Sequence, residues 1–147
     1  MIELTKPSER LQQDLEPAFT DYEQDPRSQR KANIVARAAD DHVEWTFQYY
    51  ERYDPSRLNG RDLKSFRANL ISQCPALQMM SDLADAADHR VLTRKHEPAR
   101  VVTVSTAAYY EEAGVLRVHG FDMPFRSAAE QVLTFWRNYP DFDRRSS

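Results

Sequence analysis

Glycine, cysteine and long apolar runs are scarce in this 147-residue chain, and each shortage narrows the class of protein. The three glycines, Gly60, Gly114 and Gly120, leave no glycine-rich loop of the kind that cradles nucleotide phosphates. The single cysteine, Cys74, excludes an internal disulfide and favours a reducing compartment. No apolar run approaches the roughly 20 residues of a membrane span, and the N-terminus shows no signal core. We therefore expect a cytoplasmic protein that does not contact membranes.

The charge balance argues against a protein wholly devoted to nucleic acid. The formal net charge is −3, whereas nucleic-acid-binding domains are usually strongly basic. One dense basic cluster could still bind nucleic acid locally. Its members are Arg90, Arg94, Lys95 and Arg100. The length suits a single domain over residues 1–140, and we expect residues 141–147 to form a disordered tail.

Prolines and capping residues divide the chain into predicted helices. A first helix runs from Ser8 to about Tyr22 with an interruption at Pro17. Asp25-Pro26 supplies an N-cap and a first-turn proline for a long helix that continues to Asp54-Pro55. After the Asn59-Gly60 turn, two further helices are predicted. The first carries Leu63, Phe66 and Leu70 on one face, and the second runs from Pro75 to about Thr93.

The last third of the chain changes character. Val101–Thr106 and Val115–His119 are rich in β-branched residues and predict two paired strands. Ser127–Glu130 has the pattern of a capping box and predicts a closing helix that stops at Pro140. The predicted fold is α+β: a mainly helical bundle of about four to five helices, one of them long, followed by a C-terminal β-hairpin and a closing helix.

A short segment occurs twice, as Ala38–His42 and as Ala86–His89. On helical wheels, His42 lies in the apolar arc of the long helix, and Asp88 lies in the apolar arc of the helix after Pro75. The outward residues of the helix after Pro75 are Asp82, Asp85 and His89. A buried carboxylate needs a donor. His42 is the obvious candidate to meet Asp88, and Arg67, Tyr49 or Tyr50 would also serve. The pair is either a structural cross-link or the centre of a small hydrolase, while the alanines alone would indicate close helix packing.

Two arginine–histidine spacings suggest a different chemistry. Arg37-x4-His42 and Arg90-x5-His96 fit the R-x(4–6)-H pattern of HEPN-type RNA-cleaving domains, which this chain also resembles in small size and helix content. Because Arg37 and His42 lie about 140° apart on a helix, Arg90 and His96 are the pair to which the resemblance assigns cleavage. No spacing typical of metal ligands occurs, and we expect no cofactor.

An aromatic stripe follows His42 on the long helix. Its members are Trp45, Phe47, Tyr49, Tyr50 and Tyr53. They point in too many directions for one buried face, so we expect Trp45, Tyr49 and Tyr53 to form a homodimer interface. The leading hypothesis is a non-catalytic, homo-oligomeric interaction or regulatory module. Binding to a different protein is an additional possibility. The alternatives are a HEPN-like ribonuclease using Arg90 and His96, or a hydrolase built around His42 and Asp88.

Overall fold

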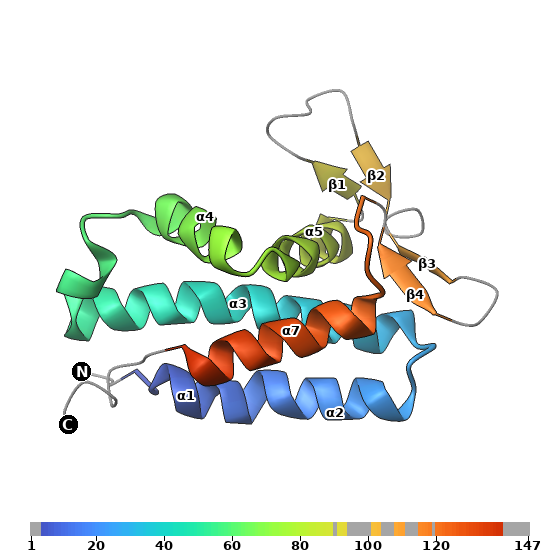
Figure 1. Cartoon of the computed structure of the whole chain (residues 1–147), viewed down its shortest axis with the longest axis horizontal. Coiled ribbons are helices and arrows are strands. Elements are labelled where there is room, and N and C mark those ends of the chain that lie inside the picture. Colours follow the sequence, from blue (N-terminus) through green and yellow to red (C-terminus); the bar gives the residue numbers. More distant parts are fainter. Residues whose placement is uncertain are drawn as a thin grey trace.

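The computed structural model describes the backbone of residues 4–89, 91–93, 101–103, 108–110, 115–118 and 120–139, and the side chains of residues 4–86, 115–118 and 120–139. Most of these residues form a helical bundle, as the sequence predicts (Figure 1). The helical elements are α1 (Pro7–Arg10), the π-helical η1 (Leu11–Leu15), α2 (Glu16–Gln24), α3 (Gln29–Tyr53), the 3₁₀-helical η2 (Pro55–Leu58), α4 (Leu63–Gln73), α5 (Ala76–His89) and α7 (Phe125–Asn138). The strands are β1 (Val91–Thr93), β2 (Val101–Thr103), β3 (Ala108–Tyr110) and β4 (Leu116–Val118).

The first helix does not break at Pro17. The segments α1, η1 and α2 follow one another with helical backbone angles from Pro7 to Gln24. Proline lacks the N–H that an α-helix uses, and its ring crowds the carbonyl one turn earlier. The turn that precedes Pro17 is the π-helical η1, whose wider spacing accommodates this local conflict. The predicted interruption is therefore a change of helical pitch inside one helix.

The long helix α3 starts later than the Asp25-Pro26 signal predicts. Its N-cap is Ser28, whose Oγ accepts a hydrogen bond from the N–H of Lys31 at 3.2 Å. Asp25 instead caps the end of α2, and its carbonyl accepts from the N–H of Ser28 in the turn that joins the two helices. The new helix cannot begin until that turn is complete. The predicted end at Asp54-Pro55 is confirmed.

Helix α3 is the centre of the bundle. In Figure 1, α1 and α2 lie along one side of it, α4 and α5 along the other, and α7 crosses in front. The predicted apolar face is confirmed: its buried members are Ala32, Val35, Ala36, Ala39, Val43 and Tyr50. Helix α5 is the main partner of α3, and the echoed alanines Ala39 and Ala86 are both fully buried. Small side chains allow two helix axes to approach closely, which accounts for the alanines of the repeated segment.

Helix α7 closes the bundle through large buried side chains. Phe125 is fully buried, and its ring meets Tyr22 edge-on with the centroids 5.2 Å apart. Near its two ends, Arg126 pairs with Glu23 at 2.9 Å and Arg137 pairs with Glu16 at 3.1 Å. Such exposed ion pairs stabilise by less than about 1 kcal/mol, whereas burying one large apolar side chain contributes about 2 to 3 kcal/mol. Burial holds α7 in place, and the ion pairs align it with α2.

The predicted C-terminal hairpin is not found as a pair of Val101–Thr106 with Val115–His119. Among the described strand residues, β4 pairs antiparallel with β3, in the register Tyr109 opposite Arg117. Strand β2 pairs with β1. The residues of β1 were predicted to be the last turn of the preceding helix, but that helix, α5, ends at His89. Each strand thus takes a partner closer in sequence, for which the entropic cost of closing the loop is smaller.

The closing helix begins before the predicted capping box. Pro124 is the N-cap of α7 and has an extended backbone, and it forms an isolated bridge with Arg117 of β4. The helix therefore starts directly at Phe125, and Ser127 lies within its first turn. Leu133 and Trp136 of this helix are buried, and α7 ends at Asn138. Residues 140–147, which include Pro140 and the predicted tail, lie outside the described residues.

The position of the α3 N-cap gives a direct test of this turn. Replacing Ser28 with alanine removes the acceptor for the N–H of Lys31 and should lower the free energy of unfolding by about 1 kcal/mol. The matched control is Asp25→Ala, which leaves that hydrogen bond in place and should cost less than half as much. Urea unfolding followed by circular dichroism measures both values. A larger loss in Asp25→Ala would contradict the assigned N-cap.

Candidate functional site

His42 lies in the core, where α3 faces α7. Its side chain is 4% exposed, and its ring meets the indole of Trp136 edge-on with the centroids 4.4 Å apart. Its neighbours Ala39 and Val43 on α3 are also buried. The prediction that His42 points inward is confirmed, and the side chain packs there as a flat aromatic ring.

The core environment keeps His42 uncharged. Burial and, to a smaller extent, the nearby positive charge of Arg10 lower the pKa of His42 to about 4. At neutral pH the imidazole is therefore neutral. A general acid or base works best when its pKa lies near the working pH and when it can reach the substrate. His42 meets neither condition, because its pKa lies far below neutral pH and its side chain is buried in the core.

Several predicted site residues fall outside the described side chains. Asp88 belongs to α5 by its backbone, but its side chain lies outside the described set, so the His42–Asp88 pair stays a prediction. The remaining ribonuclease and basic-cluster residues also lie outside the described residues: they are Arg90, Arg94, Lys95, His96 and Arg100. Arg37 is exposed on α3 whereas His42 is buried, which confirms that these two residues point in different directions.

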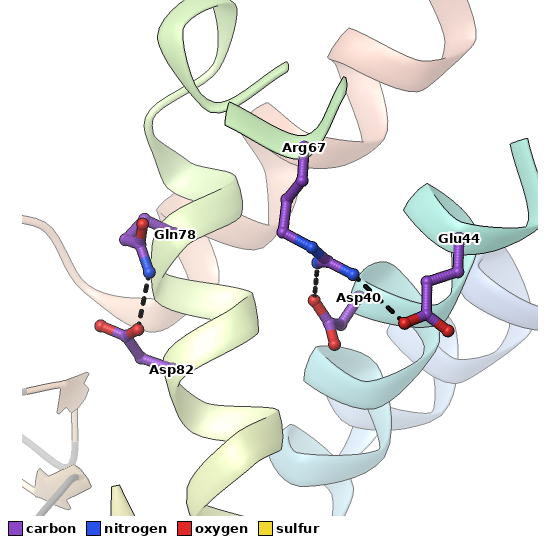
Figure 2. Close-up of polar contacts among 5 residues, drawn as sticks. All are labelled: Asp40, Glu44, Arg67, Gln78 and Asp82. Carbon is purple, nitrogen blue, oxygen red and sulfur yellow. Dashed lines mark hydrogen bonds and ion pairs between the residues drawn. The ribbon is translucent and has the colours of Figure 1, made fainter. Parts of the chain in front are cut away.

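Two acids are buried among the described residues: Asp54, which follows α3, and Asp82 on α5. Wheel analysis placed Asp82 on the outward face of its helix, and this prediction is wrong, because its side chain is 5% exposed. The amide Nε2 of Gln78, one turn earlier, donates a hydrogen bond to Asp82 Oδ1 at 2.7 Å (Figure 2). Helix α5 packs against α3, α4, α7 and β1, so more than one of its faces is covered. A single apolar arc cannot represent such a helix.

An ion-pair cluster fastens α4 to the outer edge of α3. Arg67 of α4 donates to Asp40 Oδ1 and lies 3.5 Å from Glu44 Oε1, both on α3 (Figure 2). Asp40 is partly exposed and Glu44 is exposed, so both lie on the polar side of α3. The Arg67 and Asp40 side chains are each about one-quarter exposed, so water screens this cluster only in part. The cluster is a structural link, since each of its charges already has a partner.

The aromatic stripe is covered by the N-terminal segment of its own chain. Trp45 Nε1 donates to the carbonyl of Thr5 at 2.7 Å, and the guanidinium of Arg10 stacks 4.3 Å from the Trp45 ring centre. Tyr49 is buried, and the hydroxyl of Tyr53 accepts from the N–H of Leu4 at 3.1 Å. Trp45 and Tyr53 are only partly exposed, because Leu4 and Thr5 fold back onto them. The homodimer contact through Trp45, Tyr49 and Tyr53 stays a prediction, but exposure of these side chains no longer supports it.

The open surface of the described residues holds shallow grooves and one exposed large apolar side chain. A groove of about 600 Å³ runs between the α4–α5 turn and α7, past Cys74 and Phe135. Burial raises the pKa of the Cys74 thiol, so the thiol stays protonated at neutral pH. A second groove of about 440 Å³ follows α2. His42 lines neither groove. The exposed apolar side chain is Ile34 on α3.

The described part of the chain holds no group of three or more His, Cys, Asp and Glu side chains that could bind a metal ion. In that same part, no helix has the length and apolar character to cross a membrane. Comparisons with protein-family models, with curated proteins and with solved structures found no match to this chain. Functional inference therefore rests on the chain's own residues.

The depressed pKa of His42 predicts a specific acid sensitivity. The unfolded chain takes up a proton at His42 near pH 6.5 and the folded chain only near pH 4, so stability is full above pH 6.5 and falls as the pH drops between these values. The contribution lost by pH 4.5 should be about 2 to 3 kcal/mol. Urea unfolding of wild type and His42→Phe at pH 7.5 and 4.5 measures it, because phenylalanine keeps a ring but does not titrate.

The other histidines are present in both chains, so their titration cancels in this comparison. His42→Phe should lose correspondingly less stability than wild type between the two pH values. An equal loss in both chains would show that His42 is not buried in its neutral form.

Proposed function

We propose that this chain is a non-catalytic interaction module that works as a homo-oligomer. The observation that carries the proposal is the burial of His42 against Trp136. This imidazole was the leading candidate for a catalytic group, and burial holds its pKa near 4. A neutral ring enclosed between two helices stabilises a bundle and has no route to a substrate.

Support for self-association comes from α3. Its own chain covers it with α1 and α2, with α4 and α5, and with α7, while a stripe that includes Ile34 stays exposed. An uncovered stripe along a long helix is suited to pairing with a helix of another molecule. The exposed stripe is separate from the aromatic residues Trp45, Tyr49 and Tyr53, which the N-terminal segment covers.

The non-catalytic part of the proposal predicts an absence of turnover. Purified wild-type chain should degrade a single-stranded RNA and hydrolyse an activated small ester no faster than buffer alone. The variants His96→Ala and His42→Phe should give the same rates as wild type. RNA cleavage that His96→Ala abolishes, or ester hydrolysis that His42→Phe abolishes, would replace this proposal with one of the two enzymes.

A further inference from the structure

Four exposed residues form one straight stripe along α3. They are Arg30, Ile34, Arg37 and Asp41. Their spacings of four, three and four residues are those of the contact seam of a coiled coil, so their side chains share one face of the helix. The stripe extends over about 16 Å, given a rise of 1.5 Å per residue.

The two ends of the stripe carry opposite charges, Arg30 at one end and Asp41 at the other. Neither Arg30 nor Asp41 has a hydrogen bond or an ion pair within the described part of the chain. This differs from the neighbouring Asp40 and Glu44, which Arg67 binds. Burial and the adjacent charge of Asp40 raise the pKa of Asp41. The positive charges of Arg37, Arg10 and Arg67 lower that pKa in turn, so Asp41 lies among charges of both signs in its own chain.

The charges along the stripe are arranged in a self-complementary order. The cation Arg30 lies towards its N-terminal end and the anion Asp41 lies at its C-terminal end. Between them lie Ile34, which is 45% exposed, and a second cation, Arg37. When two identical stripes meet antiparallel, Arg30 of each faces Asp41 of the other. The same arrangement lays each isoleucine against the methylene groups of the opposite Arg37, which shields the isoleucine from water.

We propose that α3 binds α3 of a second copy of this chain, antiparallel, about a two-fold axis that passes between Ile34 and Arg37. Arg30 of each copy then pairs with Asp41 of the other, and Ile34 of each copy packs on Arg37 of the other. This inference rests on the homo-oligomeric part of the proposed function and names the surface that the oligomer uses.

The stripe permits a second antiparallel register, which the same side chains disfavour. An axis between Arg37 and Asp41 would pair these two residues across the interface. It would also place the exposed Ile34 against Glu44, leaving an apolar side chain against a carboxylate. The register centred between Ile34 and Arg37 is the one that satisfies both the charges and the isoleucine.

The first measurement is the association state of the wild-type chain. A contact made by one helical stripe is smaller than a standard protein interface, so we expect a reversible dimer with a dissociation constant in the range of about 1 to 100 µM. Sedimentation velocity of the full chain at concentrations from about 5 to 200 µM covers this range. A wild-type chain that stays monomeric throughout would overturn both this inference and the homo-oligomeric part of the proposed function.

The second measurement uses charge reversal. Arg30→Glu and Asp41→Lys each place like charges opposite one another in the homodimer, and each should weaken association by about tenfold or more. Ile34→Glu should do the same. The matched control is Lys64→Glu, which makes an equal charge change at an exposed position on α4 and should leave association unchanged. Circular dichroism of every variant shows whether the fold is kept.

Mixing the two weakened variants tests whether Arg30 and Asp41 face each other in the dimer, which no other interface would require. In an equimolar mixture of Arg30→Glu with Asp41→Lys, glutamate faces lysine at one end and aspartate faces arginine at the other. The mixture should therefore associate about as tightly as wild type, as a heterodimer. A wild-type dimer that tolerates the single changes, or a mixture that stays monomeric, would overturn this surface while leaving the homo-oligomeric proposal in place.

Discussion

The burial of α3 on three of its sides is the constraint on which the rest of the molecule depends. Alanines on the face towards α5 allow close approach, and Val35 and Val43 complete the buried surface. A polar group on these faces must give up its charge or find a partner. His42 has given up its charge, since burial lowers its pKa to about 4. The remaining exposed stripe of α3 is the surface through which we propose that it binds a second copy.

Features that depend on local sequence could be predicted. The period of apolar residues identified the buried face of α3 and the inward position of His42, because helix geometry alone fixes which residues share a face. The helix end at Asp54-Pro55 and the turn at Asn59-Gly60 followed from backbone preferences, and both are found. Such signals act within a few residues, but the neighbouring turn overrides the Asp25-Pro26 start, since α3 begins after Ser28.

Features that depend on tertiary contacts could not be predicted. Asp82 lies on a helix that several elements cover, so its outward position on a wheel did not imply exposure. The stripe that contains Trp45 and Tyr53 is partly covered by Leu4 and Thr5, which carry no sequence signal for that role. Strand pairing and the start of α7 were set by contacts between segments, as the bridge from Pro124 to Arg117 illustrates. The charge order of Arg30 and Asp41 is visible in the sequence, but their exposure is not.

The antiparallel contact between two α3 helices fixes a distance that a spin label can measure. Gln48 is exposed on α3, about 12 residues from the proposed axis, so two labels there should lie about 40 Å apart across the dimer. A Gln48→Cys label in a Cys74→Ser background, measured by double electron–electron resonance at concentrations where the dimer forms, gives this value. A distance near 40 Å is the predicted result. A distance below about 20 Å, as a parallel pair would give, or no distance between the two copies, would contradict it.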